Sequence, residues 1–305
     1  MFNDLFSKGG LSLDRLRTFC AVAETGGVTK AAGGDPTRQS QFSRQIKELE
    51  TFFGVELTRR QGKTIVLSPA GVRLARIARE SFISLNDFQN ACKDEPLESS
   101  IGAGDALLQW LLFPQIGQLY DTLPKVSFNI VSLRTLDIAE RVNDQRLDFG
   151  LIRKDATSPL HKFESLGVQT FSLFVPVRLL EAKGEKDWKK VVAKVPLATI
   201  AGDGMFRGSL EREALRTKLH INFSLSCSSF PLAARALQSE RYAAILPSIA
   251  SSELDPKRFR VVPAPFLKRQ AREICLAWNP RTEALRPEIA QIKGHLVRLL
   301  RLTKT

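Results

Sequence analysis

The side chains best suited to chemistry lie between residues 37 and 47 and favour hydrogen bonding. At about 100° per residue, the spacing of a helix, they share one face, and the first acid after them is Glu48. They are Thr37, Ser40, Gln41, Arg44 and Lys47. Side chains of this kind and reach can read base edges in a DNA groove. The alternative, from composition alone, is an ordinary amphipathic helix with a solvated outer face.

Motifs of common enzymes and cofactor sites are absent from the sequence. Gly102-x-Gly104 has the start of a dinucleotide loop, but Leu107 stands where the third glycine belongs. No G-x-S-x-G or H-E-x-x-H motif occurs, and the three histidines are widely spaced. We therefore predict no catalytic residue, no cofactor, no metal site and hence no enzyme.

The four cysteines are scattered without any C-x-x-C spacing. They are Cys20, Cys92, Cys227 and Cys275. Such cysteines are typical of reduced thiols that pack in a protein interior. A redox pair of Cys227 and Cys275 is the less favoured alternative. We expect all four to be inert packing residues.

The balance of charge favours an anionic partner. Lys and Arg contribute 45 residues and Asp and Glu 32, a formal net charge of +13. Residues 15–79 alone hold twelve basic and five acidic residues, a local excess that suits nucleic acid. No apolar run approaches the roughly 20 residues that span a bilayer, and residues 1–10 lack the apolar stretch of a signal peptide. We expect a cytoplasmic protein with no membrane partner.

Three helices must position the polar face found at residues 37–47. Apolar spacing predicts helices over residues 13–23 and 28–32, each followed by a glycine pair. A third begins at Asp35-Pro36, because proline suits the first turn of a helix. Its buried stripe is Phe42, Ile46, Leu49 and Phe53. Two helices joined by a tight glycine-containing turn are the helix-turn-helix layout.

A basic hairpin and a long helix are expected next. Residues 57–67 favour two short strands around a Gln61-Gly62 turn, with Arg59, Arg60 and Lys63 as its basic side chains. Ser68-Pro69 then begins a helix that runs to about Cys92. A heptad-like stripe along it consists of Leu74, Ala78, Ser81, Leu85, Phe88 and Cys92. Because the stripe is longer than the preceding part can cover, a partner helix is its simplest cover.

An ordered set of residues in this first part matches a known pattern. The matching residues are Ala31-Ala32, Gln39, Ser43, Gln45-Ile46, Leu49-Glu50, Gly54, Leu57, Arg60, Leu67-Ser68 and Ala70-Gly71. With them the chain resembles the LysR-type transcriptional regulators. The resemblance implies a tail (1–10), a DNA-binding winged helix-turn-helix (11–67), a linker helix that dimerises (68–92) and a hinge (93–97). At three positions Asp35, Arg38 and Ser40 replace the usual apolar residue, serine and proline.

The resemblance also implies which residues meet DNA and which meet a second copy of the chain. The DNA-binding set is Thr29, Thr37, Arg38, Gln39, Ser40, Gln41, Ser43, Arg44, Lys47, Arg59, Arg60 and Lys63. Thr29 and the hairpin cations would contact phosphates, whereas Ser40, Gln41, Ser43 and Arg44 would reach base edges. The dimerisation set is Leu74, Ala78, Ser81, Leu85 and Phe88.

From residue 97 the pattern changes to alternating strands and helices. Strands are expected over residues 97–102, 125–132 and 148–152, and helices over 105–120 and 136–145. Further strands are expected over 195–199, 223–227 and 243–246, and helices over 210–219, 231–239 and 287–302. This alternation is typical of an α/β fold with a parallel sheet.

This second part resembles, more weakly, the effector-binding region of the same family, which is similar to periplasmic binding proteins. The matching segments are Phe113-Pro114, Leu147-Asp148-Phe149-Gly150 and Ala243-Ala244-Ile245-Leu246-Pro247. The resemblance implies an effector-binding domain at residues 98–305, with subdomain I at about 98–168 and 269–305 and subdomain II at about 169–268. Crossing strands are expected near residues 169–175 and 273–278. Glu240 and Tyr242 replace the usual glycines.

An effector is expected at strand ends and helix N-termini, where free backbone N–H groups favour anions. The matching residues are Gly104, Asp105, Arg134, Thr135, Gly202, Asp203, Ser228 and Ser229. Arg134 and Thr135 suit a carboxylate or phosphate, whereas Asp105 would repel one or pair with Arg134. The alternative for each is an ordinary solvated loop residue.

Together these features predict an α/β protein with an N-terminal all-α winged helix-turn-helix and a long linker helix. The expected function is sequence-specific binding of double-stranded DNA by a homodimer or homotetramer, as a transcriptional regulator modulated by a small, anionic effector. RNA polymerase is an open candidate partner. The competing hypothesis is a cytosolic small-molecule binding or enzymatic protein whose winged helix mediates protein contacts.

Overall fold

A computed structural model describes residues 3–61, 64–183, 187–201 and 205–302. The chain divides into two compact units, Met1–Glu95 and Pro96–Thr305. Each unit has hydrophobic clusters of its own. None of the helices in the described ranges is both long and apolar enough to cross a membrane.

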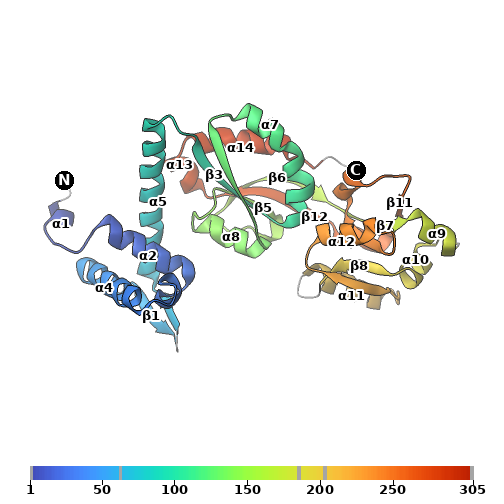
Figure 1. Ribbon diagram of the computed structural model, residues 1–305, viewed down its shortest axis with the longest axis horizontal. Coiled ribbons are helices and arrows are strands. Elements are labelled where there is room, and N and C mark those ends of the chain that lie inside the picture. Colours follow the sequence, from blue (N-terminus) through green and yellow to red (C-terminus); the bar gives the residue numbers. More distant parts are fainter. Residues whose placement is uncertain (1–2, 62–63, 184–186, 202–204, 303–305) are drawn as a thin grey trace. The chain divides into compact units, whose positions relative to one another are not determined.

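The first unit consists of helices and one hairpin. Its elements are α1 (Asn3–Phe6), α2 (Leu13–Thr25), α3 (Val28–Ala31), α4 (Pro36–Phe53), β1 (Thr58–Gln61), β2 (Thr64–Leu67) and α5 (Pro69–Cys92) (Figure 1). After α2 and α4 come Gly26 and Gly54, with φ of +73° and +66°, a left-handed backbone that glycine adopts without strain. The Asp35 carboxylate begins α4 by accepting from the amides of Thr37 (2.8 Å) and Arg38 (3.3 Å). The three expected helices are confirmed.

The core of this unit is shared by α2, α4 and α5. Its buried members are Phe19, Val22, Val28, Ile46, Leu49, Leu57 and Ala75. Ser68 begins α5, its hydroxyl accepting from the Gly71 amide at 3.0 Å. A Cβ at Gly71 would lie 2.0 Å from the Leu57 carbonyl oxygen, so only glycine lets the helix approach the chain before the hairpin this closely.

The second unit is an α/β structure. Its strands are β3 (Leu97–Ala103), β4 (Val126–Ser132), β5 (Phe149–Arg153), β6 (Lys162–Gln169), β7 (Phe171–Pro176), β8 (Leu197–Ile200), β9 (Phe223–Cys227), β10 (Ala243–Pro247), β11 (Phe259–Val262) and β12 (Arg272–Trp278). Its α-helices are α6 (Asp105–Leu107), α7 (Ile116–Thr122), α8 (Thr135–Asn143), α9 (Val177–Lys183), α10 (Trp188–Lys194), α11 (Met205–Arg216), α12 (Phe230–Gln238), α13 (Pro280–Leu285) and α14 (Glu288–Leu299). Short helices of other types are η1 (Leu108–Leu112), η2 (Phe113–Gln115), η3 (Lys154–Ala156), η4 (Ser248–Glu253) and η5 (Pro265–Gln270).

These strands form two five-stranded sheets, in the orders β4-β3-β5-β12-β6 and β11-β7-β10-β8-β9. The pairs β3/β4, β3/β5, β8/β9 and β8/β10 are parallel, as expected for strands joined through helices. However, β12 runs antiparallel to β5 and β6, and β7 runs antiparallel to β10 and β11. The expected parallel pairing of the strands near residues 97–152 is confirmed, and the antiparallel strands make both sheets mixed.

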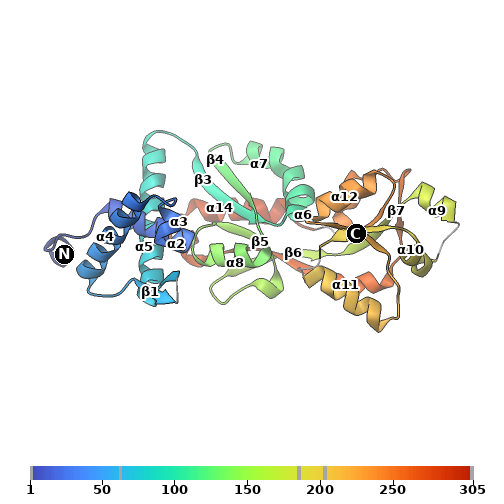
Figure 2. The ribbon, with the colours of Figure 1, turned by 60° about the horizontal axis from the view of Figure 1, so that its bottom comes forward.

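Helices cover both faces of each sheet. On the first sheet, α7 and α14 pack on one face and α8 on the other (Figure 2). On the second sheet, side chains of α10 and α11 fill one cluster and those of α12 another. The chain passes from the first sheet to the second at Thr170, between β6 and β7. It returns at Ala271, between η5 and β12, just before the expected segment at residues 273–278.

One expected helix is broken into four pieces. Residues 105–120 contain α6, the π-helix η1, the 3-10 helix η2 and the start of α7. Pro114 lacks the amide hydrogen that a continuous α-helix needs, and the Phe113 amide donates five residues back to the Leu108 carbonyl. Proline thus explains why the helical period in the sequence does not yield one straight helix.

A buried ion pair joins Arg286, near the C-terminal end of the second unit, to Asp148 just before β5. Arg286 donates through Nη1 to Asp148 Oδ1 at 2.7 Å and through Nη2 to the Glu98 carbonyl at 2.5 Å. The other Asp148 oxygen, Oδ2, accepts from the amide (2.7 Å) and the hydroxyl (2.9 Å) of Ser100. The carboxylate is therefore satisfied on both oxygens, which a buried charge requires.

We expect Arg286→Met to destabilise the second unit by about 3–5 kcal/mol, because the Asp148 charge would stay buried without its partner. Ser100→Ala removes one hydroxyl from the same carboxylate and should cost about 1 kcal/mol. All three tryptophans lie in Pro96–Thr305, so urea unfolding followed by tryptophan fluorescence reports on this unit. An Arg286→Met protein as stable as the wild type would mean that Asp148 is solvated.

Candidate functional site

The outer face of α4 carries most of the expected DNA-binding residues. Thr37, Ser40, Gln41, Ser43, Arg44 and Lys47 are exposed, and Gln39 is half-buried. The opposite face is fixed in the core by Ile46 and Leu49. Arg38 is exposed as well, and its guanidinium lies 5.7 Å from the centre of the Phe42 ring.

One acid interrupts this polar face and is held by two arginines. Glu48 Oε1 accepts from Nε of Arg44 at 3.0 Å, and Oε2 accepts from Nε of Arg15 on α2 at 2.5 Å. These hydrogen bonds, from Arg15 first and Arg44 second, hold the pKa of the Glu48 carboxyl below its usual range. The acid is therefore ionised at neutral pH and its charge is offset on both sides.

The hairpin is attached to α4 through Glu50. Its Oε1 accepts from the amides of Leu57 (2.8 Å) and Thr58 (3.1 Å) and from the Thr58 hydroxyl (3.2 Å). These bonds hold the start of β1 at the last turns of α4. In the hairpin, Arg59 lies opposite Val66 and Arg60 opposite Ile65 on β2. Both arginine side chains are exposed.

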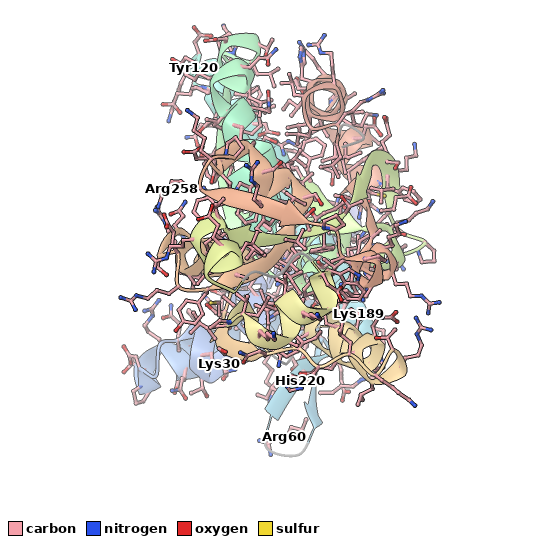
Figure 3. The ribbon with its side chains drawn as sticks, turned by 90° about the vertical axis from the view of Figure 1, so that its right-hand side faces the viewer. Lys30, Arg60, Tyr120, Lys189, His220 and Arg258 are labelled. Carbon is pink, nitrogen blue, oxygen red and sulfur yellow. The ribbon has the colours of Figure 1, made fainter. Side chains whose placement is uncertain are left out.

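Figure 3 shows Arg60 near the end of the hairpin, pointing away from its strands. Thr29 is exposed on α3. Lys63, the other expected hairpin cation, lies outside the described residues. The described part of the DNA-binding set therefore occupies α3, α4 and β1, all within the first unit.

The stripe on α5 divides into a covered half and an open half. Ala78 is buried and Leu74 packs against the core of its own unit. Ser81 is exposed, and Leu85 and Phe88 are 51% and 70% exposed. The first half of the expected dimerisation set thus has cover within its own unit, whereas the second half exposes two large apolar side chains.

In the first sheet of the second unit, the expected effector residues follow two adjacent parallel strands. Gly104 and Asp105 follow β3, and Arg134 and Thr135 follow β4. The Leu133 amide donates to the Ala103 carbonyl at 3.1 Å, so the two strand ends lie side by side. The Asp105 carboxylate accepts from the Ser132 hydroxyl. Asp105 is thus bonded to Ser132 rather than to Arg134.

In the second sheet the arrangement repeats at the ends of β8 and β9. The Ala201 amide donates to the Cys227 carbonyl at 2.7 Å. Ser228 is exposed, and the Ser229 hydroxyl accepts from the Leu232 amide at 3.4 Å at the start of α12. Gly202 and Asp203 lie outside the described residues. Helix α6 of the first group contributes Ala106 to the cluster formed by α12, so the two groups of strand ends are neighbours.

Sequence reasoning missed two groups of side chains near these ends. Phe171, Phe206 and Phe230 form a ring cluster with centroids 4.4–5.6 Å apart. Beside Phe171, the Ser248 hydroxyl bonds to those of Thr170 (2.9 Å) and Ser172 (2.8 Å). Both groups combine segments far apart in the chain, so no local spacing could have indicated them.

The cysteines agree only partly with their expected packing role. Cys20 and Cys275 are buried, and burial raises the pKa of each thiol to about 11. Cys227 is partly buried and Cys92 is exposed at the end of α5, so the expectation that Cys92 packs is wrong. Among the described residues, no group of three or more His, Cys, Asp or Glu side chains could hold a metal ion.

Comparison with known proteins gives two family matches. Residues 98–299 match the LysR substrate binding domain, and residues 13–72 match the bacterial regulatory helix-turn-helix protein of the lysR family. The chain is 31% identical over 159 residues to the probable RuBisCO transcriptional regulator of Thalassiosira pseudonana. That alignment covers 50% of this chain and 50% of the relative, so the chain spans only half the relative's length.

Solved structures share the fold along nearly the whole chain. A variant of full-length OxyR from Pseudomonas aeruginosa matches with a TM-score of 0.64 at 18% identity, covering 97% of this chain and 99% of that one. Full-length CbnR complexed with its target DNA matches with a TM-score of 0.58 at 17% identity, covering 94% and 99%. At these identities the likeness concerns the fold. Since the two family matches together cover most of the sequence, the chain belongs to the LysR family of bacterial helix-turn-helix transcriptional regulators.

Proposed function

We propose that this protein regulates transcription by sequence-specific binding of double-stranded DNA through α4 and the β1–β2 hairpin, modulated by a small effector. The LysR family to which the chain belongs is a family of regulators rather than of enzymes, in agreement with the expectation that the chain is no enzyme. The observation that carries the DNA-binding proposal is the exposed row of donors on α4 beside two exposed hairpin arginines. CbnR, which has the same fold, is known in complex with its target DNA.

The proposal divides the contacts into two kinds. Ser40, Gln41, Ser43 and Arg44 read base edges, which specifies sequence. Thr29, Arg59 and Arg60 meet phosphates, which positions the protein without specifying sequence. A phosphate contact also makes binding depend on salt, because it releases condensed counterions from the duplex.

We expect Arg44→Ala to weaken binding to the preferred duplex by about 1–3 kcal/mol and to relax the preference at one base pair. Arg60→Ala should weaken all duplexes alike and reduce the slope of log K against log salt by about one. The duplex is obtained by selection from a random pool with the wild-type protein, and affinities are measured by fluorescence anisotropy. Lys257→Ala, an exposed cation of the second unit, is the matched control. Wild-type behaviour of all three variants would contradict the assigned surface.

A homodimer formed through the second half of α5 completes the proposal. Leu85 and Phe88 offer apolar area that an equivalent helix of another copy would bury. Two copies would present two copies of α4 to two half-sites, which is how dimeric helix-turn-helix proteins bind.

We expect Leu85→Glu to convert the oligomer to monomers, because the seam would have to bury an unpaired charge. Asn86→Glu adds the same charge to the neighbouring exposed position, about 100° around the helix, and should leave the oligomer intact. Light scattering coupled to size-exclusion chromatography measures both. A Leu85→Glu protein with the wild-type mass would mean that another surface joins the copies.

The effector proposal concerns the strand ends of the second unit. Gly104, Arg134, Thr135 and Ser229 lie at helix N-termini there, where backbone N–H groups favour an anion. The ring cluster of Phe171, Phe206 and Phe230 offers an apolar side to the same region. We therefore propose a small anionic effector that carries an apolar group.

Thr135→Val removes one hydroxyl while keeping the shape of the side chain. It should leave the unliganded protein's melting temperature near that of the wild type and weaken effector binding by about 0.5–1.5 kcal/mol, the value of one hydrogen bond. A thermal-shift screen of small carboxylates and phosphates against both proteins tests this. A compound that stabilises both equally would place the site elsewhere.

A further inference from the structure

Glu48, the acid on the polar outer face of α4, needs a physical explanation. A carboxylate on a DNA-binding surface repels phosphates and lowers affinity for every sequence. The Arg44–Glu48 pair is not explained by helix stability either, because exposed pairs of this kind contribute little. The order Arg then Glu at i,i+4 is also the less favourable one in a helix.

The Glu48 carboxylate is held in place by Arg15 and in turn contacts Arg44. Arg15 on α2 and Glu48 on α4 are only 29% and 28% exposed, and their contact joins two helices 33 residues apart in sequence. Arg44 is 83% exposed and reaches the other oxygen of the same carboxylate. The Glu48 carboxylate is thus fixed by the half-buried Arg15, and it restricts the exposed Arg44.

The hydrogen bond to Glu48 uses only one of the five N–H donors of Arg44. It engages Nε, while Nη1 and Nη2 make no hydrogen bond to any residue within the described part of the chain. These two groups form the end of the guanidinium fork, which matches the O6 and N7 acceptors of guanine. Holding Nε therefore leaves an intact fork and limits the directions in which it can point.

The surroundings leave room for such a contact. An open groove of about 570 Å³ is lined by Gly9, Gly10, Arg15, Arg44, Lys47, Glu48 and Thr51. A Cβ at Gly10 would lie 3.3 Å from the Glu48 carbonyl oxygen and 3.2 Å from the Phe52 Cβ. The segment before α2 thus packs closely on α4 beside Glu48. This packing further restricts Glu48 but leaves the guanidinium of Arg44 exposed.

We propose that Glu48, anchored by Arg15, is a positioning residue that aims the guanidinium of Arg44 end-on at a guanine edge. The inference rests on the proposed function, in which Arg44 reads a base. Glu48 exchanges general affinity for discrimination: its charge weakens binding to every duplex, while its hold on Arg44 sharpens the choice among them. These two effects have opposite signs, which separates the proposal from a merely structural role.

The experiment compares the full-length wild type with Glu48→Gln on three kinds of duplex. The first carries the sequence selected by the wild-type protein from a random pool, the second set carries single base-pair replacements of each G·C pair in it, and the third carries a scrambled sequence. Glu48→Gln should bind a scrambled duplex more tightly than wild type, yet lose about three- to tenfold of the ratio between selected and replaced duplexes, a fraction of one bidentate contact. Glu56→Gln removes the same charge from another exposed position of the unit and should change only the general affinity.

A double-mutant cycle identifies the residue through which Glu48 acts. In an Arg44→Ala background, Glu48→Gln should no longer change the discrimination ratio. Arg15→Ala should lower the ratio in the same direction as Glu48→Gln, and only when Arg44 is present. Thermal unfolding by circular dichroism verifies that each variant is folded at the temperature of the binding measurement.

The outcomes distinguish this inference from the function on which it rests. If Arg44→Ala keeps the wild-type ratio, Arg44 reads no base, and the base-reading assignment and this inference both fail. If Arg44→Ala loses discrimination but Glu48→Gln keeps it, the positioning role alone is overturned. A loss of discrimination by Glu48→Gln that persists unchanged without Arg44 also overturns it.

Discussion

The narrow apolar stripe that fixes α4 against α2 and α5 is the constraint on which the first unit depends. Ile46 and Leu49 can be buried only if the helix is held in one rotation about its axis. That rotation places Ser40, Arg44 and Lys47 outward. Glu50, on the same helix, then fixes the start of the hairpin through three hydrogen bonds. The packing of α4 therefore orients both parts of the candidate DNA surface, the outer face of the helix and the hairpin.

The second unit depends on a different constraint, the direction of its strands. Parallel neighbours bring their carboxyl ends to the same edge, so the residues after β3 and β4 meet, as do those after β8 and β9. The antiparallel strands β7 and β12 carry the chain between the two sheets. The candidate effector residues are thus gathered by topology rather than by nearness in sequence.

Local signals predicted the elements of the first unit well. The Asp35-Pro36 and Ser68-Pro69 pairs, the glycines after α2 and α4 and the apolar period act within a few residues of the boundary they set. Long-range features could not be predicted in the same way. Arg15 and Glu48 meet across two helices, and the mixed sheets arise because strands distant in sequence pair in the opposite direction.

Two further predictions were wrong for local reasons that do not alter the spacing of apolar residues. Pro114 interrupts a region whose spacing still reads as one helix. Cys92 falls on the stripe of α5 but lies at the helix end, where the described unit provides no cover. The Arg44–Glu48 contact could have been found, because the two residues stand four apart on an expected helix.

The strand order of the second unit has a consequence for the sequence of events during synthesis. β12 lies between β5 and β6 but is made only after the whole of the other sheet. The strands β7 to β11, by contrast, form an uninterrupted stretch of the chain, Phe171 to Val262. A chain emerging from the ribosome can therefore complete the second sheet while the first sheet still lacks β12. Until β12 is made, β5 lacks one of its two neighbours and β6 lacks its only one, so both strands present unpaired backbone groups in the meantime.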